Sequence, residues 1–265
     1  MVSGFGGIIT KVLPVFLLVS CAAGCFLLPK KSDELFNDQF FFERGKKYMD
    51  KKDYLKAVTD FETVVESFSA SEIVDHAQFM LGEAYFKSEE YVTAAYEYER
   101  VYIDYPSSSF APEAHYKKAL CYYMESPSAI LDQENTRLAV EEFNRFIDNY
   151  PSHPLVEEAQ KNIEELTAKL AYKEYLNAET YKKLWKQYDG ALESALYYYR
   201  YIIKKYPRTI WADYSRYGIG EVHFKKKEYE KAKEMFLLVV NADVDAELKE
   251  KASKMLDEIE KIETR

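Results

Sequence analysis

The sequence predicts an all-α fold built from about five helix pairs and closed by a C-terminal helix. Three observations predict it. The 265 residues include only 9 glycines and 8 prolines, too few for folds that turn every few residues. A frame of small and aromatic residues recurs along the chain, and Tyr-Pro dipeptides separate the recurrences because proline cannot extend a helix. Aromatic residues make up 16% of the chain, which excludes a disordered protein.

Charge and cysteine content exclude two further classes. The formal net charge is −9, so a broad nucleic-acid-binding surface is not expected. Three cysteines cannot form a disulfide framework. Two of them lie within the first 25 residues, in a segment of different composition from the rest.

The first segment has the composition of a bacterial export signal. Lys11 is its single charge before an uncharged stretch over residues 12–28. Cys21 follows Leu18-Val-Ser and Cys25 follows Ala22-Ala-Gly, and both settings resemble a lipobox, in which the cysteine is acylated. We predict a signal peptide over residues 1–20 and a lipidated linker over residues 21–34, with Cys21 as the acylated residue and Cys25 as the alternative.

An uncleaved anchor helix is the other reading of this segment. Its 17 apolar residues reach the lower limit of a membrane-spanning helix, roughly 17–25 residues. A helical anchor has no use for two cysteines that follow small residues, so the lipid anchor is favoured. In either case, the rest of the chain is exported and tethered.

Three units of the repeat share one spacing. Each has a small residue, an aromatic or imidazole ring three positions later, an alanine nine positions after that, and an aromatic four positions further on. The three sets are Gly45, Tyr48, Ala57 and Phe61; Gly82, Tyr85, Ala94 and Tyr98; and Gly220, His223, Ala232 and Phe236. Glycine and alanine let two helices approach closely, and the aromatic residues fill the gaps between successive pairs.

Two units depart from this spacing. In the third, the interval from Ala119 to Ala139 is longer, and the excess residues at 125–133 are expected to form a surface loop. In the fourth, a long first helix is expected from Pro154 through Tyr188, before Asp189-Gly190 breaks it. A helix over residues 246–262 is expected to cap the stack.

These units resemble the tetratricopeptide pattern, which implies a right-handed superhelix of about five tetratricopeptide-like helix pairs with a C-terminal capping helix. We assign residues 35–151 to repeats 1–3 and residues 152–265 to repeats 4–5 and the cap. Enzyme motifs are absent from the sequence, so no catalytic activity, metal site or cofactor is expected beyond the covalent lipid. His223 and Cys121 are expected to pack in the interior.

A peptide-binding groove is the one binding site that the repeat suggests. In the tetratricopeptide fold, the first helix of each pair lines a concave surface. Positions one turn from the packing residues carry aromatic, aliphatic and basic side chains in repeats 1–3: Phe42, Lys46, Met49, Phe79, Phe86, Lys87, Tyr116 and Tyr123. Such a strip suits an extended peptide with aromatic side chains and a free carboxylate. The alternative is that these rings belong to the core.

The lipobox, the five helix pairs and the long first helix of the fourth pair together resemble the BamD family of lipoproteins. The most specific stretch joins the third and fourth repeats, from Ala139-Val-Glu-Glu-Phe143 through Tyr150-Pro151 to Lys169-Leu-Ala and Glu174. The resemblance covers residues 35 to about 260. It implies a non-catalytic scaffold of the outer-membrane β-barrel assembly machinery, lipid-anchored at the periplasmic face of the outer membrane.

The resemblance also implies partners. The N-terminal repeats would receive the C-terminal, aromatic-ended signal of unfolded outer-membrane barrel proteins. The C-terminal repeats would dock on a periplasmic domain of the barrel-forming subunit, with accessory lipoproteins in the same complex. Lys169 matches a basic position of the family's docking segment, whereas Asn162 stands where relatives often have arginine.

Two other functions are compatible with parts of the sequence. A different periplasmic tetratricopeptide lipoprotein, scaffolding cell-wall or envelope-constriction enzymes, would share the lipobox and the repeats. Such a protein would not need the long first helix of the fourth repeat. A wall-cleaving enzyme with a helical superhelix would need a separate catalytic domain, and the repeats occupy the chain up to its capping helix.

Overall fold

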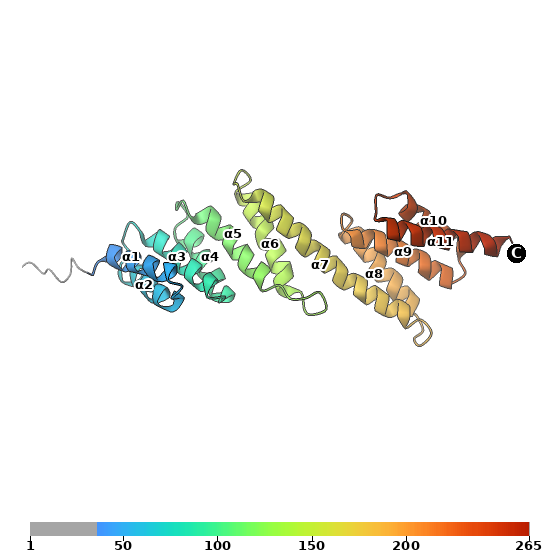
Figure 1. Ribbon diagram of the computed structural model, residues 1–265, viewed down its shortest axis with the longest axis horizontal. Helices are drawn as coiled ribbons and strands as arrows, with labels where there is room; N and C mark the ends of the chain where they lie inside the picture. The colour runs from blue at the N-terminus through green and yellow to red at the C-terminus, as the bar shows by residue number, and fades with distance from the viewer. Residues whose placement is uncertain (1–35, 265) are drawn as a thin grey trace, which may run out of the picture. The chain divides into compact units, whose positions relative to one another are not determined.

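The computed structural model describes residues 36–264, and all of the regular secondary structure in that range is α-helical. Ten of the described helices form five consecutive pairs, and an eleventh follows them (Figure 1). The pairs are α1 (Asp38–Asp50) with α2 (Tyr54–Ser67), α3 (Val74–Lys87) with α4 (Tyr91–Asp104), α5 (Ala111–Met124) with α6 (Glu134–Asn149), α7 (Val156–Lys183) with α8 (Ala191–Lys205), and α9 (Ile210–Lys225) with α10 (Tyr229–Asn241); the last helix is α11 (Ala246–Glu263).

The predicted all-helical class and the helix pairs are confirmed. Each helix packs on its neighbours in the chain, so the core is a series of small clusters between successive helices. The long helix predicted in the fourth unit is α7, which has 28 residues. The loop predicted at 125–133 joins α5 to α6. Residues 1–35, which include the predicted signal peptide, linker, Cys21 and Cys25, lie outside the described residues.

Close approach within a pair depends on the glycines of the repeat frame. A Cβ added at Gly45 would lie 2.7 Å from the Phe61 ring, and one at Gly82 would lie 2.7 Å from the Tyr98 ring. At Gly220, the corresponding distance to the Phe236 ring is 2.6 Å. These distances leave no room for a side chain, so the small residue on one helix and the ring on the next form a single packing unit.

The turn inside three of the pairs has one geometry. Lys52, Glu89 and Lys227 each lie seven residues after the repeat glycine, and their φ angles are 60°, 66° and 61°. In each turn, the next backbone N–H donates to the carbonyl five residues earlier, as from Asp53 to Tyr48 at 2.9 Å. This is the hydrogen bond of a Schellman motif, which ends the first helix.

The turn inside the fourth pair and the start of the cap helix have different signals. Gly190 has a φ of 77° and immediately precedes α8. The first helix of this pair, α7, already ends at Lys183, five residues before the end predicted at Tyr188. The cap helix α11 has Asp245 as its N-cap residue, whose side chain accepts a hydrogen bond from the Leu248 N–H at 2.8 Å. Leu248 and Ile259 are buried against the cluster around Phe236. The predicted capping helix is thus confirmed within one residue of its end.

Candidate functional site

One aromatic contact recurs in all five pairs of the described structure. The residue three positions before the small residue of the first helix is aromatic and tilts against the ring on the second helix. The ring centroids are 5.4–6.0 Å apart and the planes are inclined at 53–58°. The contacts are Phe42–Phe61, Phe79–Tyr98, Tyr116–Phe143, Tyr175–Tyr199 and Tyr217–Phe236.

These contacts correct part of the predicted groove. Phe42, Phe79 and Tyr116 are only 3%, 7% and 3% exposed, so they belong to the core and not to a ligand-facing surface. The physical reason is the helix period, because residues i and i+3 lie on the same face. A ring three positions before Gly45 therefore points, like Gly45 itself, toward the partner helix. For these three residues, the core alternative is correct.

The position four residues after the small residue of the first helix is partly exposed to solvent. It holds Met49, Phe86 and Tyr123, each of intermediate exposure. Phe86 packs edge-on against Tyr91, with centroids 5.3 Å apart. The Tyr123 hydroxyl donates to Glu165 on α7 at 2.8 Å, so that side chain also bridges two repeats. The partly exposed part of the predicted groove is thus centred on Phe86.

The ammonium group of a lysine lies over the Phe86 ring. The Lys117 ammonium lies 5.4 Å from the centre of the Phe86 ring and 2.8 Å from a Glu83 oxygen. Glu83 also accepts a hydrogen bond from the Tyr98 hydroxyl at 2.5 Å. Lys87 is exposed on the same helix. Lys117 is not among the residues predicted from the sequence, because it lies on the first helix of the next pair, α5, and only the fold brings it over Phe86.

Lys46 occupies the corresponding region of the first repeat. Its ammonium lies 3.3 Å from Glu43 and 5.6 Å from the centre of the buried Phe42 ring. The Lys46 side chain keeps 45% of its exposure. Lys46 and Lys87 therefore remain accessible to an anionic group, while the apolar contact surface beside them is smaller than the sequence predicts.

The predicted docking residue Lys169 lies on α7 and contacts the loop at 125–133. Its ammonium donates to the Ser126 hydroxyl oxygen at 3.0 Å. One turn later, Lys173 donates to the backbone carbonyl of Ile130 at 2.7 Å. The loop itself is held by Gln133, which is 2% exposed and whose amide donates to the Ser128 carbonyl at 2.9 Å. Lys169 is thus half-buried and helps to fasten this loop to the long helix.

The candidate reactive side chains are held in the interior. Cys121 is 1% exposed, and burial raises the pKa of its thiol to about 12, which keeps it protonated. His223 is 8% exposed, and its Nδ1 lies 2.6 Å from a Glu228 oxygen. Both residues pack as the sequence predicts.

Residues 36–264 contain no group of histidine, cysteine and carboxylate side chains arranged to hold a metal ion. Within the same range, no helix combines the length and apolar character needed to cross a membrane.

Comparisons with known proteins identify a family. The sequence model described as "Outer membrane lipoprotein", named YfiO, matches residues 36–215. A tetratricopeptide repeat model matches residues 214–243, which include most of α9 and α10. No curated protein matches the chain.

Several solved structures align with most of the chain at low identity. MamA MSR-1 is 16% identical, with 81% of this chain and 98% of that chain covered and a TM-score of 0.32. The assembly chaperone of RpL4, Acl4, is 14% identical, with 84% and 85% covered and a TM-score of 0.37. A tetratricopeptide repeat protein from Parabacteroides merdae is 12% identical, with 82% and 98% covered and a TM-score of 0.26.

Proposed function

The chain belongs to the YfiO family of outer membrane lipoproteins, and from that premise we propose that it is a non-catalytic scaffold of the machinery that assembles outer-membrane β-barrels. The observation that carries this proposal is the family match over residues 36–215. The match includes α1 to α8 and therefore the irregular junction of the third and fourth repeats, the stretch by which the sequence resembles BamD lipoproteins.

In this proposal, the first three repeats receive the C-terminal segment of an unfolded barrel protein. A terminal aromatic side chain would pack on the exposed edge of Phe86, and the free carboxylate would be attracted by Lys87 and Lys46. Met49 and Tyr123 would flank the same strip. The chemistry supports this because a half-exposed ring beside ammonium groups binds an aromatic carboxylate better than either group alone.

The N-terminal cysteines and the C-terminal repeats would serve for anchoring and docking. An acyl chain on Cys21, or on Cys25, would hold the protein at the periplasmic face of the outer membrane, with no other cofactor. The fourth and fifth repeats would dock on a periplasmic domain of the barrel-forming subunit, together with accessory lipoproteins. Lys169 would act there by fastening the 125–133 loop, whose Ile130 and Leu131 are 70% and 55% exposed.

Binding of a synthetic peptide tests the receiving role. The probe is a fluorescent peptide that ends in phenylalanine with a free carboxylate, and its C-terminally amidated form is the second probe. We expect Phe86→Ala with Lys87→Glu to weaken binding about tenfold, as loss of an aromatic anchor and a charge contact does. Amidation should weaken binding to the wild-type protein as well.

A matched control lies in the fifth pair. Phe224 occupies the same repeat position as Phe86 and packs edge-on against Tyr229, with centroids 5.6 Å apart. Phe224→Ala with Lys225→Glu removes the same chemical groups outside the first three repeats and should leave binding unchanged. Equal loss of affinity in both variants, or none in either, would refute the proposed peptide site.

A further inference from the structure

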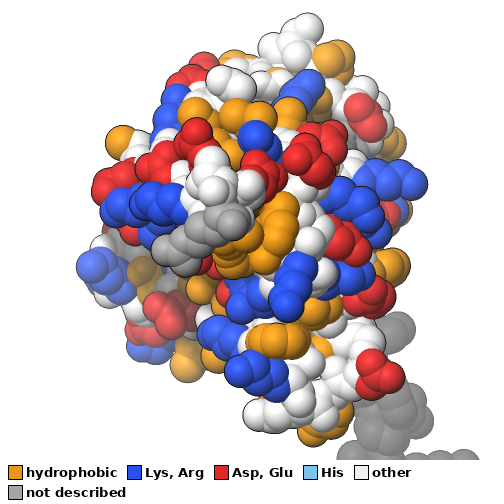
Figure 2. Space-filling view, turned by 90° about the vertical axis from the view of Figure 1, so that its right-hand side faces the viewer, with side chains coloured by type: hydrophobic (Ala, Val, Ile, Leu, Met, Phe, Trp, Pro, Cys, Tyr) orange, Lys and Arg blue, Asp and Glu red, His pale blue; other side chains and the backbone are white. Residues whose placement is uncertain are grey.

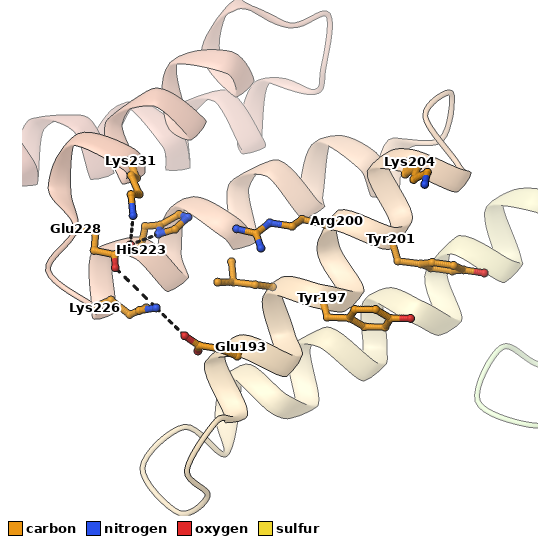
Figure 3. A pocket seen from close by; sticks show the side chains of 10 residues that line it. Glu193, Tyr197, Arg200, Tyr201, Lys204, His223, Lys226, Glu228 and Lys231 are labelled. Atoms are coloured by element: carbon orange, nitrogen blue, oxygen red, sulfur yellow. Dashed lines mark hydrogen bonds and ion pairs between the residues drawn. The ribbon is translucent and has the colours of Figure 1, made fainter.

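A cavity of 630 Å³ lies between α8 and the turn from α9 to α10, away from the predicted peptide site (Figure 3). Its volume is in the range of ligand pockets, roughly 300–1,000 Å³. From α8 it is lined by Tyr197, Arg200, Tyr201 and Lys204, spaced at i, i+3, i+4 and i+7. This spacing puts all four side chains on one helix face.

The acidic side chains of this cavity are already paired. Glu193 accepts from Lys226 at 2.7 Å. Glu228 accepts from Lys231 at 3.3 Å and contacts His223 Nδ1 at 2.6 Å, as the dashed lines of Figure 3 show. The hydrogen bond with His223 and the nearby lysines lower the pKa of Glu228, so it stays ionised.

Two cations of the cavity have no such partner. Within residues 36–264, neither Arg200 nor Lys204 forms an ion pair or a hydrogen bond, and both side chains are exposed. In Figure 3, the Arg200 guanidinium extends from α8 toward His223. Lys204 lies in the last turn of α8, where a cation complements the helix dipole, but Arg200 lies before that turn. The dipole therefore does not account for Arg200.

The cavity is also aromatic. The Tyr197 and Tyr201 rings are nearly parallel, inclined at 18° with centroids 6.5 Å apart. Tyr197 is 65% exposed. Exposed tyrosine next to arginine is the composition that protein interfaces favour at their energetic centres. With four Lys or Arg side chains against two Glu, the lining carries a net positive charge in a chain whose net charge is −9.

We propose that this cavity binds an acidic peptide segment of a partner protein. One carboxylate would form a bidentate pair with Arg200, a second would reach Lys204, and an aromatic or aliphatic side chain between them would pack on Tyr197 and Tyr201. Charge complementarity identifies the occupant. On the face seen in Figure 2, Lys and Arg side chains are interspersed with Asp and Glu side chains.

A direct binding measurement tests the proposal. The probe is a fluorescein-labelled, C-terminally amidated peptide Asp-Glu-Phe-Glu-Asp, compared with the uncharged Asn-Gln-Phe-Gln-Asn. Full-length protein should bind the acidic probe in a salt-sensitive manner and the uncharged probe at least about tenfold more weakly. Arg200→Glu with Lys204→Glu should weaken binding of the acidic probe about tenfold or more, and Arg200→Gln with Lys204→Gln should fall between this variant and wild type.

The matched control reverses two exposed lysines outside the cavity, Lys47→Glu with Lys183→Glu, and should bind like wild type. A similar loss in this control would show that only overall charge matters and would overturn the proposal. Binding to phosphatidylglycerol vesicles through Arg200 and Lys204, without binding of the peptide, would overturn it in favour of an anionic lipid surface.

The cavity lies in the fourth and fifth repeats, so this proposal does not rest on the peptide-receiving role proposed above for the first three repeats, and the two can fail separately. Phe86→Ala with Lys87→Glu should retain full affinity for the acidic probe. Arg200→Glu with Lys204→Glu should retain full affinity for the peptide that ends in phenylalanine. Circular dichroism checks that each variant folds. Lys87, Arg200 and Lys204 are exposed, and Phe86 is partly buried at the edge of its core cluster.

Discussion

Tyr199 shows at the scale of one residue how packing and charge are joined in this repeat. Its side chain is 0% exposed, its ring lies against Tyr175 with centroids 6.0 Å apart, and a Cβ at Gly218 would collide with it. The Tyr199 hydroxyl donates to Glu179, which is also bonded by Lys182 at 2.6 Å. Burial, and then this hydrogen bond, raise the pKa of Tyr199 far above its ordinary value of 10.

This raised pKa predicts a loss of stability in alkali. Below about pH 10, Tyr199 is neutral in both states; above it, the unfolded chain releases a proton that the folded chain retains. Each such tyrosine lowers the free energy of unfolding by about 1.4 kcal/mol per pH unit. We expect Tyr199→Phe to reduce the slope of unfolding free energy against pH by about that amount, measured by urea denaturation between about pH 10 and 12.

Tyr199→Phe should also lower stability at neutral pH by about 1–3 kcal/mol, because the partly buried Glu179 loses a donor. Tyr188 is 63% exposed, so Tyr188→Phe is the control and should leave the alkaline slope unchanged. An unchanged slope in Tyr199→Phe would show that the hydroxyl ionises as easily in the folded protein as in the unfolded chain.

At the scale of the element, the turn between the two helices of a pair has a backbone conformation that its side chains do not explain. Lys52, Glu89 and Lys227 are exposed and have positive φ, a conformation that suits glycine. The backbone adopts it because the Schellman hydrogen bond closes the first helix and aims the second one back along it. The sequence carries no glycine here, so these left-handed residues could not be predicted from composition.

Glycine at these turns should therefore stabilise the protein. A non-glycine residue in the left-handed conformation destabilises the folded state by about 1–2 kcal/mol, and glycine removes this cost. Glycine also raises the conformational entropy of the unfolded chain, which offsets part of the stabilisation. We expect Lys52→Gly, Glu89→Gly and Lys227→Gly each to raise the free energy of unfolding by roughly 0.5–1 kcal/mol. Chemical denaturation of each single variant measures this effect.

Lys51→Gly is the control for this comparison, because Lys51 is exposed and adjacent but has no positive φ. Glycine there gains nothing in the folded state and should lower stability. If all four glycine variants lose stability alike, the left-handed turn carries no strain in solution.

At the scale of the whole molecule, each cluster of buried residues involves mainly neighbouring helices of the chain. Such a stack offers a long row of repeat positions to partners while its core stays local. The family match covers most of this row, from α1 to α8. The proposed peptide strip lies in the first repeats and the proposed docking region in the last, so we expect that both could be occupied together.

Co-purification from the outer membrane tests this whole-molecule role. We expect tagged, full-length protein, extracted in gentle detergent, to bring with it a barrel protein carrying repeated periplasmic domains in stoichiometric amount. The same tag on a chain with Cys21→Ser and Cys25→Ser should leave the outer-membrane fraction, because the lipid is its proposed anchor. Mass spectrometry identifies the co-purified proteins. Recovery of wall enzymes or division proteins in their place would support the other lipoprotein scaffold and contradict barrel assembly.

The sequence by itself determined the helix pairs, the long α7, the loop at 125–133 and the cap, because glycine, alanine, aromatic and proline spacing reports helix contacts directly. Tertiary structure alone decided which rings are accessible. Phe42, Phe79 and Tyr116 share a face with the small residues and are buried against the second helix, whereas Phe86 stays partly exposed under Lys117 from the next pair. Spacing defines the face of one helix, but exposure depends on what the neighbouring helix covers.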